Sequence, residues 1–390
     1  MAARSARGAT RAAESEASEY TLIFRADDGA GVPSGLGEGE VEVDFSEQHD
    51  RIPHVSDDGI EKAWRRQLLS APRTWDAPKF RLANVFVPSA ARGTTARGAR
   101  ADRRDGRAAP AVVLRLGSTS YKEHVGTCTS SRDAAARRAL REDGLATFGS
   151  ASAHFSDALG VAAALETCDG GLVLLRRAAG VVGSVGKFNG PSGHPEPELS
   201  ELSEPTGTVS ARAAPEDDAR GDEGSESSRR SVRSKSSRSV REELFASILR
   251  EIVEETGVPS ASLSPPRLIG AARDGFGKPD LLFRVATALD SRRVVAAARR
   301  ARDAWESDAV VVVSAIHPED ADAPVDARFH ERLTRLFWAR CPDAMAAVTR
   351  ALAECLSPKT GAGVGTGVGE ARRASCVTSR ADLNENTPRT

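Results

Sequence analysis

Short apolar stretches with a polar residue at every second position recur along the chain and predict β-strands. Residues 20–26 (YTLIFRA) and 41–45 (VEVDF) show this alternation, and residues 171–177 (GLVLLRR) are almost wholly apolar, as in a buried strand. Further strands are expected at 79–87, 111–117, 268–274, 281–287 and 309–315. Strands spread over most of the chain, with helices between them, predict a fold of the mixed α/β (α+β) class.

Apolar residues at helical spacing predict helices between these strands. A short amphipathic helix is expected to begin near Asp57 and to end before Pro72. A longer acidic helix is expected at about 240–256. Other helical patterns lie at 132–143, 157–165 and 326–356.

Composition separates folded from unfolded parts of the chain. Residues 199–238 are mostly Ser, Glu, Asp and Arg with almost no large apolar side chains, so we expect this segment to be disordered. Residues 1–17 and 357–390 are expected to be disordered tails. The total of 390 residues then suggests two domains, an N-terminal one at 18–165 and a second at 166–356 that contains the insertion.

Charge and cysteine content exclude several classes of protein. The net charge is −1, so no overall field favours nucleic acid or a membrane surface as a partner. Five scattered cysteines without a CxxC pair argue against a disulfide framework or zinc site and fit a reducing compartment, with the cytoplasm as the first expectation. The Ala-, Arg- and Ser-rich residues 1–17 leave targeting to an organelle as the alternative. Protein partners cannot be predicted from these features.

The acidic helix carries two different faces. An apolar stripe runs along it through Phe245, Ile248, Leu249, Ile252 and Val253. Glutamates gather on the opposite side. They are Glu243, Glu251, Glu254 and Glu255. Carboxylates three or four residues apart repel one another by a few tenths of a kcal/mol per pair, and a divalent cation would turn that repulsion into attraction.

The ends of the acidic helix have local signals of their own. Ser239 and Glu242 fit a capping box at its start, and Gly257 and Pro259 fit its end. The alternative interpretation of the acidic face is a solvated surface without function, and for an ordinary glutamate-rich helix that interpretation would be preferred.

The sequence of this helix is more specific than its charge. Residues 250–258 (REIVEETGV) follow the pattern R-E-apolar-x-E-E-x-G-apolar, which resembles the core of the Nudix box, the signature of the Nudix hydrolase family. The family pattern places a glycine and an acid before this core. At the required distances the chain has Ser236 and Glu242. The glycine turn is therefore absent from its usual place.

A matching turn lies upstream of the insertion. Residues 190–198 (GPSGHPEPE) resemble the P-G-G-x-x-E-P turn that opens Nudix boxes, with Ser192 in place of the first of the two adjacent glycines. The box is thus split by about forty residues. Because the entropy of loop closure grows only logarithmically with length, the split costs about 1–2 kcal/mol. Serine does not tolerate every positive-φ turn, so the geometry of the turn is an open question.

The split box resembles one branch of the family, which hydrolyses UDP-glucose and UDP-galactose and carries an extra N-terminal domain. Stretches such as 48–51 (QHDR), 76–82 (DAPKFRL), 114–121 (LRLGSTSY) and 157–165 (DALGVAAAL) resemble that branch too. The resemblance covers about 20–350 apart from loops. It implies a Nudix α/β/α sandwich with a mixed sheet, preceded by a smaller β-rich α+β domain.

The resemblance also implies a Mg²⁺ site, with Mn²⁺ as an alternative ion. The metal-side residues it implies are Gly193, Glu243, Glu251, Glu254 and Glu255. For the upstream acid we favour Glu243 over Glu242, because Glu243 points toward the acidic face. Glu251, and after it Glu254, is the candidate to accept the proton of the attacking water. Arg250 is expected to hold a carboxylate in place, and Glu306 is a further candidate for acid–base work.

Substrate recognition has to come from outside the box. Basic and aromatic residues within the strand-like stretches are candidates to contact the substrate. They are Lys79, Phe80, Arg81, Arg115 and Tyr121. Each of them has a purely structural alternative, as a packed aromatic ring or a partly buried basic side chain. His49 and His194 are assigned no catalytic role.

The expected activity is hydrolysis of UDP-sugars to UMP and a sugar 1-phosphate. Two alternatives stay open. One is a Nudix hydrolase for another nucleoside diphosphate derivative, such as ADP-ribose or coenzyme A. The other is a silent Nudix module that binds nucleotides, although all three glutamates of the core are present, which argues against it.

Overall fold

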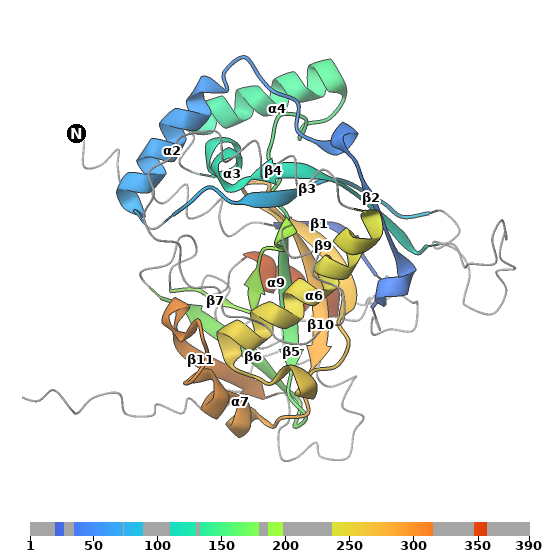
Figure 1. Ribbon diagram of the computed structural model, residues 1–390, viewed down its shortest axis with the longest axis vertical. Coiled ribbons are helices and arrows are strands. Elements are labelled where there is room, and N and C mark those ends of the chain that lie inside the picture. Colours follow the sequence, from blue (N-terminus) through green and yellow to red (C-terminus); the bar gives the residue numbers. More distant parts are fainter. Residues whose placement is uncertain are drawn as a thin grey trace, which may run out of the picture. The chain divides into compact units, whose positions relative to one another are not determined.

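The computed structural model describes residues 20–26, 35–72, 74–88, 110–129, 133–178, 186–197, 236–314 and 347–356. The strands, in chain order, are β1 (Tyr20–Arg25), β2 (Val41–Phe45), β3 (Pro78–Phe86), β4 (Val112–Ser120), β5 (Gly160–Glu166), β6 (Gly171–Arg177), β7 (Phe188–Asn189), β8 (Ser192–Gly193), β9 (Arg267–Asp274), β10 (Pro279–Ala286) and β11 (Ser307–Ser314). The helices are α2 (Asp58–Ser70), α3 (Tyr121–Thr127), α4 (Ala134–Phe148), α6 (Ser237–Thr256), α7 (Ser291–Ala298) and α9 (Ala347–Leu356), and Figure 1 shows their arrangement.

The larger sheet is mixed. Its strand order is β1-β9-β10-β5-β6-β11, and the short strands β7 and β8 pair with β6 and β5. β10 and β5 run parallel, while the other pairs are antiparallel. A mixed sheet was the expectation from the sequence, and it is confirmed.

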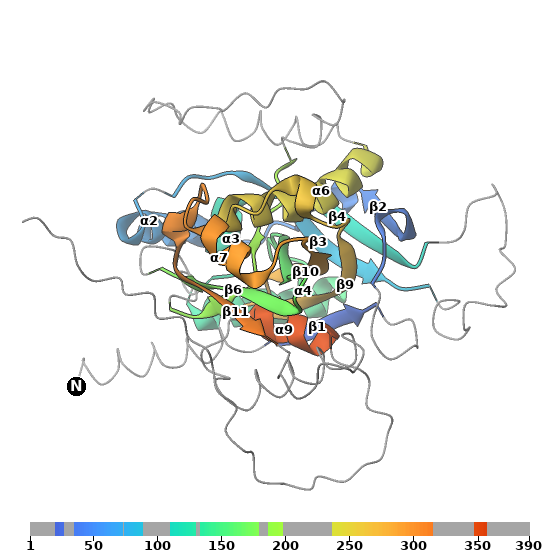
Figure 2. The same ribbon diagram turned by 90° about the horizontal axis from the view of Figure 1, so that it is seen from below.

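Helices cover both faces of this sheet. Along β5, Val161, Ala163 and Leu165 belong to the core that contains the apolar stripe of α6. The residues between them, Ala162 and Ala164, pack in the second core with α9. Alternate residues of a strand point to opposite faces, so one strand supplies both cores. Figure 2 shows α6 and α9 on the two sides of the sheet, which gives the predicted α/β/α sandwich.

The smaller sheet consists of β2, β4 and β3 in that order, with β2 parallel and β3 antiparallel to β4. Its inner face joins the core under α6, and the Ser237 hydroxyl at the start of α6 accepts a hydrogen bond from the Phe45 amide at 3.1 Å. Residues just before β5 connect the sheets, since the Leu159 amide donates to the Phe80 carbonyl at 2.8 Å.

The sheet boundaries differ from the expected domain boundary at 165. β1 and all but the last residue of β5 precede residue 166, yet both are strands of the larger sheet. The described residues belong to a single unit that extends to Pro358. Whether the two sheets mark separately folding domains stays a prediction.

Most predicted elements are confirmed, and two interpretations are wrong. Residues 157–165 were expected to be helical, but β5 begins at Gly160. After Asp157 every position in this stretch is apolar or glycine, and such a pattern does not distinguish a buried strand from a buried helix. The capping box is also absent, because α6 begins at Ser237 and its N-cap is Ser236, whose hydroxyl accepts from the Ser239 amide at 3.1 Å.

Two helices, α3 and α7, were not predicted, since each is too short to show a clear period.

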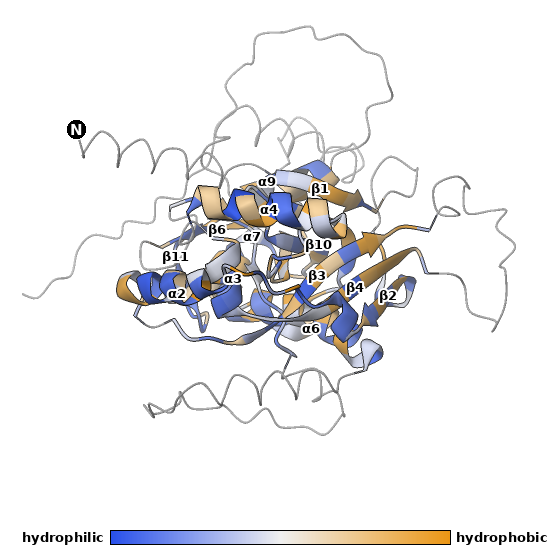
Figure 3. Cartoon of the chain, turned by 90° about the horizontal axis from the view of Figure 1, so that it is seen from above, coloured by the Kyte–Doolittle hydropathy of each residue, from blue (hydrophilic) through white to orange (hydrophobic). Residues whose placement is uncertain are grey.

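Of the expected C-terminal helices, residues 347–356 are helical as α9, and 326–346 lie outside the described residues. Of the insertion expected at 199–238, residues 199–235 also lie outside them, as do the two tails, whereas residues 236–238 are the N-cap and first residues of α6 rather than disordered. Figure 3 shows hydrophilic and hydrophobic residues alternating along the outer helices α2 and α4. Within the described residues, we find no helix with the length and apolar character required to cross a membrane.

Candidate active site

The glycine turn and the acidic helix meet in space although the insertion separates them in sequence. The amide of Ser192 donates a hydrogen bond to Oε2 of Glu255 at 3.0 Å. Gly193 lies directly against Glu251, and an added Cβ at this position would collide with the Glu251 carboxylate. β8 is held by its pairing with β5, where Gly193 faces Val161. The structure thus brings together the two halves of the split box.

Ser192 fits the turn without strain. Among the described residues, Asp157 is the one non-glycine residue with positive φ, so Ser192 has an ordinary backbone conformation. Its hydroxyl accepts a hydrogen bond from Nδ2 of Asn189 at 2.6 Å. The departure from the two-glycine pattern is therefore compatible with the turn.

Two carboxylates of α6 lie beside this turn, Glu255 buried and Glu251 partly buried. Burial, followed by the charge of Glu254, raises the pKa of Glu251 to about 7. Burial and then the neighbouring Glu251 raise the pKa of Glu255 well above its ordinary value. Buried carboxylates close together are unfavourable unless a proton or a cation compensates them. Several oxygen donors, without sulfur or nitrogen, are what Mg²⁺ or Mn²⁺ prefers, so the residues present fit a hard divalent cation.

Glu243 is held by a different set of contacts. Its side chain is 3% exposed, and Arg250 donates to Oε1 at 2.6 Å. The amide of Glu196, in the glycine turn, donates to the same oxygen at 3.0 Å. Burial raises the pKa of Glu243, while Arg250 and the Glu196 amide oppose this rise. Arg250 therefore orients the Glu243 carboxylate, and this carboxylate in turn holds the glycine turn through the Glu196 amide.

Glu242 points to a different environment. Its carboxylate accepts from Nε of Arg238 at 2.8 Å, on an exposed part of α6. Of the two candidates for the upstream acid, Glu243 is thus the one that contacts the turn. The role of Glu243 beside a metal ion stays a prediction.

Glu254 and Glu306 lie at the edge of the acidic cluster. Glu254 is paired with Arg302, with 2.6 Å between Oε1 and Nη1. Glu306 stands at the start of β11, and its charge is among the causes that raise the pKa values of Glu251 and Glu255. Burial raises the pKa of Glu306 itself, and Arg177 opposes this. Glu306 therefore lies near the proposed catalytic carboxylates. A role in acid–base catalysis requires this proximity.

Two of the predicted substrate contacts are structural residues. Phe80 is 0% exposed and packs edge-on against Phe45, so its ring has no face available for a base. Arg81 is 3% exposed, and its guanidinium donates to the carbonyls of Phe155, His49 and Ser152 at 2.7–2.9 Å. We correct both assignments, because the local strand pattern could not show that both side chains are buried, Phe80 in the core and Arg81 among backbone carbonyls.

The other predicted substrate contacts have varied surroundings. Arg115 lies 3.9 Å from Asp44 on the exposed side of β4. Tyr121 begins α3, and burial raises the pKa of its hydroxyl while Arg177 lowers it. The charge of Arg177 also lowers the pKa of Glu255. Tyr121 and the acidic cluster therefore share one charged neighbour.

Lysine and histidine side chains lie close to His194, which follows Gly193 in the turn. Burial first, and then the charges of Lys278 and Lys79, lower the pKa of His124 to about 3. The same causes lower the pKa of His194, the residue after Gly193. Nδ1 of His194 contacts the Leu159 carbonyl at 3.0 Å, and Nδ1 of His124 is buried without a hydrogen-bond partner. Of this group, the sequence pointed to Lys79 alone as a substrate contact.

Comparison with known proteins agrees with this geometry. No family model matches the chain. Uridine diphosphate glucose pyrophosphatase NUDT22 of Homo sapiens is 33% identical over 281 residues, which cover 71% of this chain and 76% of that protein. The corresponding protein of Bos taurus is 34% identical over 67% of this chain and 77% of its own length. Nudix hydrolase 9 of Arabidopsis thaliana is 32% identical over 77% of this chain and 84% of its own length.

The chain belongs to the Nudix hydrolase superfamily. The relatives place it in the branch that includes NUDT22, and it is a Nudix pyrophosphatase by descent. The Nudix box was recognisable from residues 250–258 because its charged positions are fixed on one helix. The Arg250–Glu243 and Glu254–Arg302 pairs were not recognisable, since each depends on how side chains turn in the folded protein.

Proposed function

We propose that this Nudix hydrolase cleaves the diphosphate bond of UDP-sugars, with UDP-glucose and UDP-galactose as the first candidates, to give UMP and a sugar 1-phosphate. The observation that carries the proposal is the closure of residues 190–197 onto α6, with Ser192 bonded to Glu255 and Gly193 against Glu251. The names of the curated relatives support the choice of substrate.

We propose that Glu251, Glu255 and the backbone of Gly193 hold Mg²⁺, with Mn²⁺ as an alternative. When bound, the ion would offset the negative charge of the diphosphate and lower the cost of bringing water to it. Glu254 is bonded to Arg302, and it joins this set if the ion pair opens. We propose Glu243 as the carboxylate that supports the set by holding the turn through the Glu196 amide.

The protein's own groups have two tasks in the reaction. One carboxylate accepts a proton from the attacking water as the new P–O bond forms, and Glu251 is our first candidate and Glu254 our second. The P–O bond to the leaving phosphate then breaks, and UMP and the sugar 1-phosphate separate. Arg250 keeps Glu243 in one orientation and is a positioning residue. Glu306 is a further candidate to move a proton at its carboxylate.

Basic and aromatic groups beside the turn are our candidates for substrate binding. Besides burial, Lys79 and Lys278 both lower the pKa values of His124 and His194, so two lysines lie close to the residue that follows Gly193, and Lys278 is also paired with Asp280. A nucleoside diphosphate carries negative charge that such groups attract. We propose that Lys79 and Tyr121 contact the UDP portion, with Arg115 farther out.

The test is direct measurement of UMP. The full chain is incubated with Mg²⁺ and, separately, with UDP-glucose, UDP-galactose, ADP-ribose and coenzyme A, and the products are separated by chromatography. We expect UMP from both UDP-sugars, at least about tenfold faster than cleavage of the other two, and no product when EDTA removes the metal. Faster cleavage of ADP-ribose or coenzyme A would overturn the substrate assignment, and no cleavage of any would overturn hydrolysis.

A further inference from the structure

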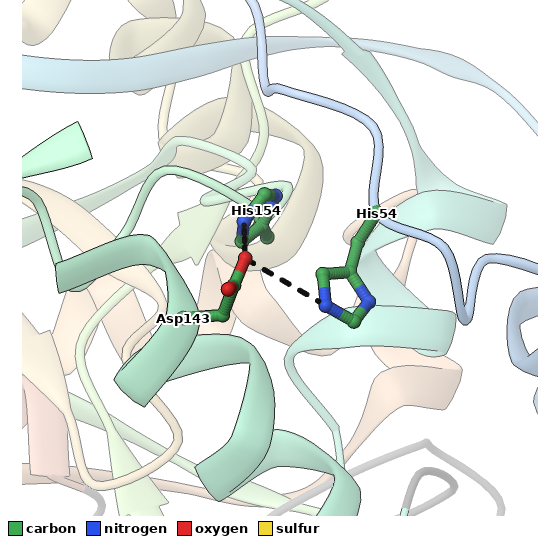
Figure 4. Close-up of side chains that lie close together, drawn as sticks. All are labelled: His54, Asp143 and His154. Carbon is green, nitrogen blue, oxygen red and sulfur yellow. Dashed lines mark hydrogen bonds and ion pairs between the residues drawn. The ribbon is translucent and has the colours of Figure 1, made fainter. Parts of the chain in front are cut away.

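A second cluster of metal-type side chains lies outside the acidic site. His54 precedes α2, Asp143 lies on α4, and His154 is in the loop after α4. Their nearest donor atoms all lie within 4.8 Å of one another. Figure 4 shows the three side chains converging from these separate segments. Among the described residues, this is the one group of histidine, cysteine and acidic side chains with this geometry.

Both ring nitrogens of His154 face hydrogen-bond acceptors. The side chain is 2% exposed, with Nδ1 at 2.8 Å from the Ile52 carbonyl and Nε2 at 2.9 Å from Oδ2 of Asp143. Both neighbours accept hydrogen bonds, but a neutral imidazole carries one proton. With a neutral ring, one nitrogen lone pair would therefore face an acceptor oxygen. This is avoided if His154 is an imidazolium, or if a cation lies between Nε2 and the carboxylate.

Two of the three separations between the ligand atoms are close to those around a small metal ion. Oδ2 of Asp143 lies 2.9 Å from Nε2 of His154 and 3.8 Å from Nε2 of His54. Ligand atoms about 2.0–2.1 Å from a tetrahedral metal are about 3.3 Å apart, so the observed separations lie on both sides of that value. The third separation, between the two imidazole nitrogens, is at most 4.8 Å, so shifts of up to about 1.5 Å, chiefly of the exposed Asp143 and of His54, would bring all three atoms to one ion.

Each of the three side chains is held by a second contact. His154 has the Ile52 carbonyl, Asp143 accepts from the Thr147 hydroxyl at 3.3 Å, and Nδ1 of His54 lies 2.8 Å from the Ser56 hydroxyl. Metal-binding histidines commonly donate their other N–H to a carbonyl or oxygen in this way. His54 must change most, because the Ser56 amide also approaches its Nδ1 at 3.1 Å, so its proton lies on Nε2 without metal. Metal binding would displace that proton.

We propose that His54, Asp143 and His154 form a binding site for a divalent transition metal of the zinc type, separate from the hydrolytic site. Two imidazoles favour such ions over Mg²⁺. The fourth position is open to water, since the side chains of Asp143 and His54 are 47% and 16% exposed. The ion would link the loop before α2, helix α4 and the loop after it. The proposal does not depend on the substrate of the enzyme.

Zinc binding to the full-length protein tests the site. The metal-free protein is titrated with Zn²⁺ in the presence of saturating Mg²⁺, which occupies oxygen-only sites, and bound zinc is measured after dialysis. We expect about one equivalent for the wild type, and affinity at least about tenfold lower for His54→Gln and Asp143→Asn. The matched control is His49→Gln, because His49 also contacts a carboxylate, at 2.8 Å from Asp44, but has no second histidine.

Two further measurements make the result decisive. Cobalt(II) in place of zinc should give visible absorption bands without thiolate charge transfer, which excludes binding by the cysteines. Near-UV circular dichroism should show that the partly exposed His54→Gln variant keeps the native fold. A wild type that retains no zinc would overturn the proposal, and protons on both ring nitrogens of His154 by NMR would then account for its two acceptor contacts. Equal zinc affinity of the wild type and both variants would overturn it too.

Discussion

Two clusters of ligand-type side chains in this molecule differ in chemistry and in origin. The acidic cluster offers carboxylates from α6 beside a glycine turn, and the charge of the partly buried Glu251 raises the pKa of the buried Glu255. The histidine cluster offers two imidazoles and one carboxylate, with Asp143 already between the rings. One helix supplies most of the first, whereas three separate segments supply the second. The comparison teaches that a motif identifies a site when its residues share one element, while a site assembled by the fold leaves no local pattern.

The largest expected effect is on the acidic cluster. Glu255→Gln should lower the rate of UDP-sugar hydrolysis about 10³-fold, because a neutral amide cannot offset the charge of a metal ion. The fold should persist, since the amide still accepts the Ser192 hydrogen bond. Steady-state kinetics measure the effect, with Glu242→Gln as the control, since Glu242 contacts Arg238 on the exposed side. Similar activity of Glu255→Gln and the wild type would exclude Glu255 from the catalytic set.

The contact between the turn and the helix should be the next most sensitive feature. Gly193→Ala places a methyl group against the Glu251 carboxylate, and overpacking of this kind costs about 1–3 kcal/mol of stability. If the turn moves by about 1 Å instead, the rate should fall about 10²-fold. Thermal unfolding and kinetics are measured together. Gly39→Ala is the control, because an added Cβ there meets no atom within 4 Å. An active and stable Gly193→Ala protein would contradict the close approach.

The comparison of the two clusters also explains what the sequence could predict. The apolar stripe of α6 and the αL cap at Gly257 follow local rules, so the helix and its end were predicted correctly. Its start was not, because several serines near residue 236 are equally suitable caps and the tertiary contact of Ser237 with Phe45 favours one. The segment 157–165 was misassigned because the pairing of β5 with β10 decides its structure.

The candidate site also contains features that local sequence patterns predict and features that depend on tertiary contacts. Spacing along one helix identified Glu251 and Glu255, and the matching turn identified Gly193, although 57 positions separate Gly193 from Arg250 in the numbering. Ion pairs that depend on side-chain rotamers and tertiary packing could not be predicted from a sequence pattern. The pair of Arg302 with Glu254 is an example. Phe80 and Arg81 failed as substrate contacts for the related reason that tertiary packing covers both faces of β3 at these adjacent positions, Phe80 by the core under α6 and Arg81 by the segment 152–155.

A moderate effect is expected where an ion pair supports the acidic cluster from outside. Arg250→Lys keeps the charge but loses the forked contact with both oxygens of Glu243. We expect a fall in kcat of about tenfold with little change in KM, because the turn is held less firmly while the substrate contacts are intact. Arg238→Lys, at the exposed pair with Glu242, is the matched control. A change confined to KM would place Arg250 at the substrate and contradict its positioning role.

The smallest expected effect is on hydrolysis when the histidine cluster is changed. His54→Gln should reduce zinc affinity while altering kcat/KM for a UDP-sugar by less than about twofold, because His54 contacts Ser56 and Asp143 and no carboxylate of α6. Glu255→Gln should show the reverse, with hydrolysis lost and one zinc equivalent retained in the presence of Mg²⁺. Measuring both properties in both variants separates the two clusters, since distant sites without shared partners act independently. If His54→Gln lowers hydrolysis as strongly as it lowers zinc binding, the clusters are coupled and their separation, as argued from the structure, is wrong.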